Sequence, residues 1–353
     1  MSTSPAELAL GSARQIGRSF AVVSAVPGAV LVAYLFALVT SVLGQGDGPN
    51  LAAVGQAVEG LSLLDLGLLA LAGLIVGVVL QPLQFATVQL LEGYWGTSTV
   101  GQAAMVVRIR RYRRLWTRLT ERRDDAAVAL NLAGVDQRGP MSDDEDLASI
   151  VALQETDRVR QRYPDAANRL MPTRLGNVLR RHEDLAGSQY ELSAPLVVPH
   201  LALIAPKEHL DYLDDRRNEL DAAVRLCLVW LLCSGATLVA LWPTGFPLLA
   251  TLVPYALTYL SYRGAVGAAQ HYGGALSTLI DLNRFRLYEH LGLGAPTNAQ
   301  SERVRNIELM KLLRYRKVEL HYGSPGAEPD LLECAGVPSG TSVVEPVDEA
   351  PAL

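Results

Sequence analysis

Two long stretches without a charged side chain constrain this chain more than any other feature of its sequence. Residues 19–44 and residues 66–91 each form an uncharged run of 26 residues. An α-helix needs about 20 predominantly apolar residues to cross the hydrocarbon core of a bilayer. Each run is therefore long enough to span a membrane as one helix. The first run is too long for a signal peptide, and no small-residue cleavage site follows it.

A second pair of apolar segments follows later in the chain. They occupy residues 226–242 and 245–262, and they meet at the uncharged sequence WPTGFP. This turn is too short for anything except a tight hairpin, with Arg225 and Arg263 marking the opposite ends of the two apolar runs. Each run is slightly short, so we expect Arg225 to extend its guanidinium group toward the membrane interface. The pattern predicts a third and a fourth span.

The distribution of Lys and Arg indicates the direction of these spans. The loop at residues 45–65 contains neither residue type, and neither does the WPTGFP turn. The cations lie in the N-terminal segment, in the long central segment, or after residue 262. Cytoplasmic segments of membrane proteins carry this excess of positive charge. We therefore expect the N-terminus, the central segment and the C-terminus to lie in the cytoplasm.

The sequence thus predicts an all-α, multi-pass integral membrane protein. Its four transmembrane helices would form two hairpins with a helical cytoplasmic insert between them. The predicted segments are a cytoplasmic N-terminus (1–18), TM1 (19–44), an extracytoplasmic loop (45–65), TM2 (66–92), a helical cytoplasmic module (93–220), TM3 (221–242), TM4 (245–262), cytoplasmic helices (263–322) and a disordered acidic tail (323–353).

A cluster of arginines directly follows the second predicted span. The cations that we expect to contact a membrane surface or an anion there are Arg108, Arg110, Arg111, Arg113, Arg114 and Arg118. The net charge of the whole chain is −5, so the positive charge is local and nucleic-acid binding is disfavoured. The helix at residues 101–123 either lies along anionic headgroups or continues the second span into the cytoplasm.

A second basic stretch has the sequence MPTRLGNVLRRHEDLAG (171–187). Thr173 is suited to cap a helix that ends near Gly187. This helix carries Arg174, Arg180 and Arg181, which makes an anion or headgroup contact the alternative to a purely structural role. The acidic run at 143–146 lacks the spacing of a calcium loop and fits a helix N-terminus, so we expect no metal site.

The LLEGYW and PTRLGN stretches carry a resemblance. They are similar to stretches found in the same order in a group of uncharacterised polytopic membrane proteins of high-GC Gram-positive bacteria, and the excess of Arg over Lys (28 to 3) fits such a genome. The resemblance implies a location in the bacterial cytoplasmic membrane. It does not imply a particular activity. The order of spans also resembles the layout of bestrophin-type anion channels, in topology only.

The sequence contains none of the common catalytic motifs, so we expect no enzyme activity, no catalytic residue and no cofactor. The predicted function is a membrane-anchored scaffold, docking or signalling component whose cytoplasmic module binds a protein partner. The alternative is a homo-oligomeric anion channel with TM2 around the pore and Gln81, Gln84 and Gln89 at its mouth. Tyr94 and Trp95 are expected to anchor TM2 at the headgroup level.

Overall fold

The protein is described by a computed structural model over residues 26–43, 50–132, 144–242 and 245–315. Within these residues the regular structure is helical, without a strand, as the sequence predicts. Two of the described helices are long and apolar enough to cross a membrane, α4 (Leu63–Glu92) and α9 (Lys207–Leu241). The predicted N-terminus (1–18) and acidic tail (323–353) lie outside the described residues.

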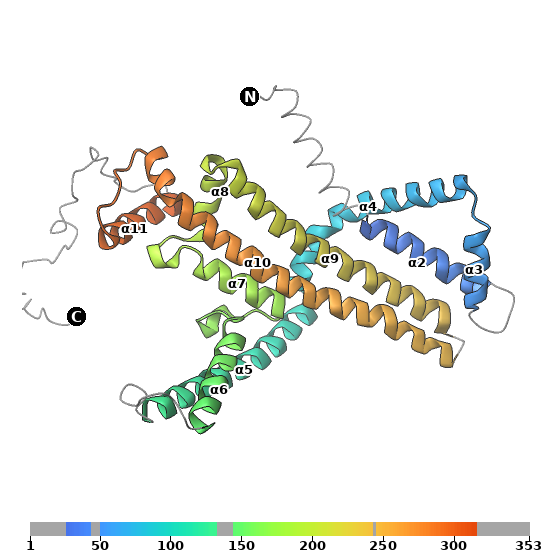
Figure 1. The fold of residues 1–353 in the computed structure, drawn as a ribbon, viewed down its shortest axis with the longest axis horizontal. Coiled ribbons are helices and arrows are strands. Elements are labelled where there is room, and N and C mark those ends of the chain that lie inside the picture. The colour runs from blue at the N-terminus through green and yellow to red at the C-terminus, as the bar shows by residue number, and fades with distance from the viewer. Residues whose placement is uncertain (1–25, 44–49, 133–143, 243–244, 316–353) are drawn as a thin grey trace, which may run out of the picture.

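The longest helices, α9 and α10 (Leu252–His290), form an antiparallel pair that runs through the whole molecule (Figure 1). A short 3-10 helix, η5 (Phe246–Thr251), leads into α10. Each long helix is apolar toward the short connection between them and charged toward the other end. Residues 207–241 form one continuous helix, and α10 likewise continues far past the apolar segment.

A helical hairpin packs on the apolar end of this pair. It consists of α2 (Val26–Leu43) and α4, with the short helix α3 (Leu51–Glu59) between them (Figure 1). The sequence analysis treated residues 45–65 as a loop and did not foresee α3. Helix α2 contacts both α4 and α9, and Tyr34 of α2 hydrogen-bonds Thr237 of α9 at 2.6 Å.

Three glycines set the close contact between α2 and α4. A Cβ atom added to Gly28 would lie 2.2 Å from the carbonyl oxygen of Gly73 and 2.6 Å from the backbone nitrogen of Gly77. Small residues four positions apart allow two membrane helices to approach at the backbone. The Gly73–Gly77 pair was available in the sequence as a small-xxx-small pattern, and the sequence analysis did not use it.

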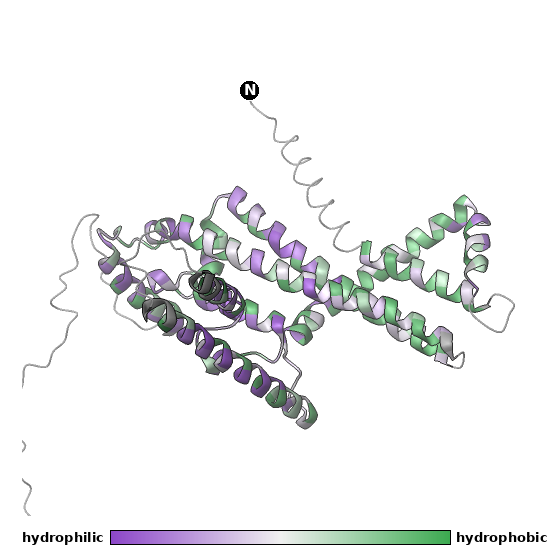
Figure 2. Cartoon of the chain, turned by 60° about the horizontal axis from the view of Figure 1, so that its bottom comes forward, coloured by the Kyte–Doolittle hydropathy of each residue, from purple (hydrophilic) through white to green (hydrophobic). Residues whose placement is uncertain are grey.

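The surface of this end is apolar. Figure 2 shows the hydrophobic colour concentrated on the α2–α4 hairpin and on the adjoining halves of α9 and α10, while the other half of the molecule is largely hydrophilic. Helix α4 buries little of its apolar face against the protein. Its exposed apolar side chains are Leu63, Leu64, Leu66, Leu68, Leu71, Leu74, Ile75, Val78, Val79, Leu83, Phe85 and Leu90. An exposed apolar surface of this kind is compatible with contact to lipid.

The hydrophilic half contains the remaining helices: α5 (Thr99–Leu132), α6 (Asp144–Arg160), α7 (Arg174–Leu185), α8 (Ala194–Ile204) and α11 (Ala299–Tyr315). Helices α5 and α6 form an arm that projects from the body (Figure 1). Helices α7, α8 and α11 pack around the charged end of α10. Their core includes Val197, Leu201, Ile280, Tyr288 and Leu309, each at most 1% exposed.

We predict that Gly28→Ala weakens the α2–α4 hairpin, because the new methyl group would meet backbone atoms that have no room to move. The free energy of unfolding in detergent should fall by about 1–3 kcal/mol. Thermal denaturation of the purified protein measures this change. The control is Gly67→Ala in the partner helix α4, since nothing lies within 4 Å of a Cβ at Gly67. Equal effects of the two substitutions would contradict the close contact.

Candidate functional site

The candidate site begins where α4 ends. Gly93 adopts a left-handed conformation (φ 107°), and its N–H donates to the carbonyl oxygens of Gln89 and Leu90 at 3.0 and 3.2 Å. A glycine at this position is a common way to terminate a helix. The chain then turns away, so α5 starts as a separate helix at Thr99 and does not continue α4. Trp95 folds back and donates from its indole nitrogen to the Leu90 carbonyl oxygen at 2.9 Å.

The first turn of α7 lies directly on this helix end. The Thr173 hydroxyl donates to the Glu92 carbonyl oxygen at 2.8 Å and accepts from the Gly176 N–H at 3.0 Å. A Cβ at Gly176 would lie 2.1 Å from the Glu92 oxygen, and one at Gly93 would lie 2.3 Å from the Pro172 ring. The predicted cap by Thr173 is confirmed. The positive N-terminus of α7 thus meets the negative C-terminus of α4, which is a favourable arrangement of helix dipoles.

Two further side chains hold the start of α7. The fully buried Asn177 accepts from the Met171 N–H and donates to the carbonyl oxygens of Met171 and Thr173, at 2.6 to 2.9 Å. Tyr262 of α10 accepts from the N–H groups of Arg174 and Leu175 at 3.1 and 3.3 Å. These N–H groups have no partner inside their own helix, so Tyr262 satisfies them. We name the contact of residues 90–96 with residues 171–177 and Tyr262 the span–module junction.

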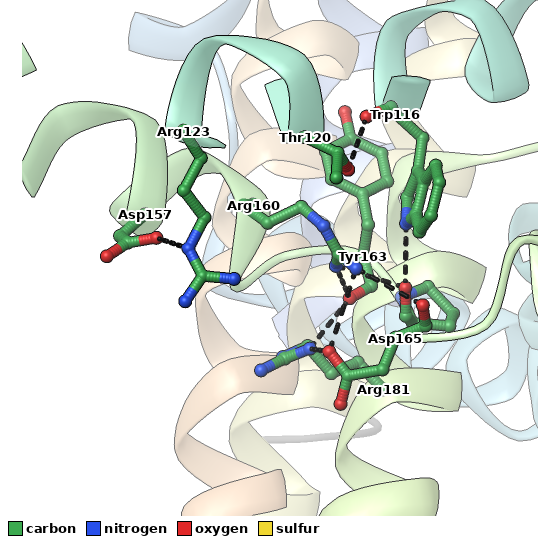
Figure 3. Close-up of polar contacts among 9 residues, drawn as sticks. Trp116, Thr120, Arg123, Asp157, Arg160, Tyr163, Asp165 and Arg181 are labelled. Carbon is green, nitrogen blue, oxygen red and sulfur yellow. Dashed lines mark hydrogen bonds and ion pairs between the residues drawn. The ribbon is translucent and has the colours of Figure 1, made fainter. Parts of the chain in front are cut away.

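Two of the predicted anion-binding arginines are engaged in protein contacts beside the junction. Arg180 donates to the Tyr94 hydroxyl at 3.1 Å and pairs with Glu183 at 3.3 Å. Arg181 donates to the Tyr163 carbonyl oxygen at 3.0 Å and pairs with Asp165 at 2.6 Å (Figure 3). Tyr94, predicted as an interface anchor, is half exposed.

Arg181 connects α7 to the α5–α6 arm through the cluster drawn in Figure 3. Arg160 at the end of α6 donates to the Tyr163 and Pro164 carbonyl oxygens at 3.1 Å and lies over the Trp116 ring at 4.7 Å. Trp116 of α5 donates to the Pro164 carbonyl oxygen at 3.0 Å. Burial lowers the pKa of Arg160 and raises that of Tyr163. The apolar face of α5 is therefore covered by protein rather than by lipid around Trp116.

The arginines of α5 divide between two faces of the helix. Four of the predicted cations, together with Arg174 of α7, line a groove of about 830 Å³. Its lining residues are Leu90, Leu91, Trp95, Arg108, Arg111, Tyr112, Arg114, Leu115, Arg118, Thr173, Arg174, Tyr259 and Tyr262. Arg110 and Arg113 do not line it. We call this feature the arginine groove. It lies beside the junction, and it includes the other predicted anchor, Trp95.

The three predicted pore-mouth glutamines do not all lie on one face of α4. The Gln84 side chain accepts a hydrogen bond from Arg225 of α9. Gln81 is half-buried, and Gln89 is exposed. Gln84 therefore points toward α9 of its own chain. Gln89 is five positions further along α4, so it lies on another face of that helix.

His182 of α7 lies against the bare backbone of α10. A Cβ at Gly273 would lie 2.1 Å from the ring carbon Cγ of His182. The ring lines a cavity of about 240 Å³ together with Glu92, Glu183 and Tyr272. Burial, with a contribution from Arg181, lowers the pKa of His182. The imidazole is accordingly neutral at neutral pH.

No group of three or more His, Cys, Asp or Glu side chains suited to a metal occurs among the residues that the structure describes. Cys227 and Cys233, within the same part of the chain, are buried free thiols. Comparisons with protein-family models, with curated proteins and with solved structures found no match to this chain.

Loss of the Thr173 hydroxyl tests the junction. Thr173→Val removes the cap of α7 and its bond to Glu92, so we expect the free energy of unfolding to fall by about 1–2 kcal/mol. Chemical unfolding in detergent measures it. Thr173→Ser keeps the hydroxyl and should remain close to the wild type. A valine variant as stable as the serine variant would contradict the role of the hydroxyl.

The buried His182 predicts a pH dependence. The unfolded chain binds a proton at this residue below about pH 6.5, whereas the folded protein does not until a lower pH. Stability conferred by neutral His182 is therefore present above about pH 6.5 and is lost as the pH falls toward the lowered pKa. The melting temperature is measured once above about pH 6.5 and once well below it. The difference between the two melting temperatures should be smaller in His182→Gln than in the wild type. An unchanged difference would contradict this assignment.

Proposed function

We propose that this protein is a four-span protein of the bacterial cytoplasmic membrane that acts as a scaffold or docking component for a cytoplasmic partner. Helices α4 and α9 supply two spans of sufficient length and hydropathy. Helix α2 (18 residues) belongs to an uncharged sequence run, residues 19–44, that is long enough for a full span. The uncharged residues 245–262 would form the fourth span beside α9.

The membrane in this proposal covers the apolar end of the molecule. The predicted extracytoplasmic loop carries no Lys or Arg. It contains α3, which lies at the apolar end (Figure 1). The arginines of α5 and the charged halves of α9 and α10 lie on the other side. This orientation satisfies the positive-inside rule and leaves both termini in the cytoplasm.

The direction of the polar side chains of α4 favours a scaffold over an α4-lined pore. Gln84 contacts Arg225 of its own chain, and the buried Thr87 hydroxyl donates to the Leu83 carbonyl oxygen. The face of α4 that a neighbouring subunit could reach is lined by leucine, valine, isoleucine and phenylalanine. A water-filled ion path needs polar groups along its wall, and Gln89 near the end of α4 is the one predicted pore-mouth glutamine that is exposed.

The hydrophilic half is built to hold a fixed shape relative to the spans. It has its own apolar core, and the span–module junction ties it to α4 through direct backbone contacts. Large apolar side chains remain on its surface away from the proposed membrane, notably Leu203 (86% exposed) on α8 and Ile307 (44% exposed) on α11. Exposed apolar groups on a charged surface are a common mark of protein contact sites.

Site-specific photo-crosslinking in living cells tests the proposal. A photoreactive amino acid at Leu203 or Ile307 should yield one discrete protein adduct after illumination. The control position is Val253, which is exposed on the apolar part of α10 and should react with lipid only. Absence of a protein adduct from both surface positions, together with anion flux in liposomes by a closed ring of four or more subunits, would replace the scaffold with the channel.

A further inference from the structure

We propose that the arginine groove binds the phosphate group of a single anionic phospholipid, whose acyl chains run along α10 and α4. The inference rests on the proposed membrane location, and it goes beyond a general attraction of basic residues to a charged bilayer. The proposed site is lined by both basic and apolar side chains, and only some of the arginines of α5 belong to it.

The lining of the site contains five guanidinium groups and no carboxylate. Arg108, Arg111, Arg114 and Arg118 project from α5, and Arg174 projects from the first turn of α7. None of the lining residues is acidic. Convergent guanidinium groups bind phosphate by paired, charge-assisted hydrogen bonds, which makes arginine the preferred residue for planar recognition of this anion.

These five cations differ from the arginines that hold the module together. Within the described residues, the arginines that pair with a carboxylate are Arg123, Arg160, Arg169, Arg180, Arg181, Arg216, Arg217 and Arg284. None of the groove arginines forms an ion pair with a described carboxylate. Like charges held close together repel each other, and a bound anion would relieve this repulsion.

The lining of the groove also contains side chains that are suited to hydrocarbon. They are Leu90 and Leu91 of α4, Leu115 of α5 and Tyr259 of α10. Tyr259 is 52% exposed, and the neighbouring Tyr255 and Leu260 are exposed as well, so an apolar strip continues along α10. A small soluble anion would leave this strip unused. An amphiphile with a phosphate and acyl chains matches both the basic and the apolar lining residues.

The position of the groove places it at headgroup depth in the proposed membrane. Trp95, just after the end of α4, lies in its wall, and indole and phenol rings favour the boundary between headgroups and hydrocarbon. The volume of about 830 Å³ is enough for a headgroup, with the chains outside. Thr173 and Tyr262, which also line the groove, connect the site to the span–module junction.

Lipid retention by the purified full-length protein tests the site. The protein in detergent is incubated with equal amounts of phosphatidylglycerol and phosphatidylcholine and examined by native mass spectrometry. The wild type should retain one phosphatidylglycerol molecule in preference to phosphatidylcholine. Arg111→Gln/Arg114→Gln should lower that affinity at least about tenfold. The matched control is Arg110→Gln/Arg113→Gln, which removes the same charge at the same spacing from the other face of α5 and should leave affinity unchanged.

Three results would overturn the inference. Equal losses in the two double variants would show a diffuse charge effect. Equal retention of phosphatidylcholine would show that the groove does not select an anion. Displacement of the lipid by inorganic phosphate alone would assign the site to a soluble anion. None of these three results bears on the proposed scaffold function. That function is tested separately by photo-crosslinking at Leu203 and Ile307. A wild type that stays folded and monomeric without detergent or lipid would instead remove the membrane location itself.

Discussion

The contact between the end of α4 and the start of α7 determines how the rest of this molecule is arranged. Thr173 bonds the last carbonyl group of the helix, and Gly93 and Gly176 allow the two backbones to touch. Tyr262 brings α10 into the same contact. The hydrophilic half is therefore in direct contact with the end of α4. The arginine groove lies beside this contact, and Thr173 and Tyr262 belong to both.

Arginine has different roles in neighbouring parts of this structure. Arg160 and Arg181 are paired and bonded to backbone carbonyl oxygens, so they hold the arm on the body. Arg180 links α7 to Tyr94. The groove arginines have no carboxylate partner in the described residues, and they line a groove together with aliphatic and aromatic side chains. Composition alone does not separate these roles, because the separation depends on which face of a helix meets which neighbour.

Much of the secondary structure was predictable, whereas the contacts of the site were not. Caps and hydrophobic periodicity indicated α7 and the long helix α9, since these signals are local. The LLEGYW and PTRLGN stretches were recognised as separate features. Their contact depends on the tertiary approach of Gly93 to Pro172, which no local pattern encodes. Gln84 illustrates the same limit, because its partner Arg225 is 141 residues away. The Gly73–Gly77 pattern could have predicted the α2–α4 contact.

Proximity of Tyr94 and Arg180 in native membranes tests the junction most directly. Their side chains are hydrogen-bonded at 3.1 Å, so Tyr94→Cys with Arg180→Cys should be joined by a short bis-maleimide and recovered as one cross-linked peptide pair. Tyr94→Cys with Arg303→Cys is the control, because α11 lies at the far end of the module (Figure 1). Cross-linking of the first pair alone is the expected result. Singly modified peptides from both pairs would show that the module is not fixed to the end of α4.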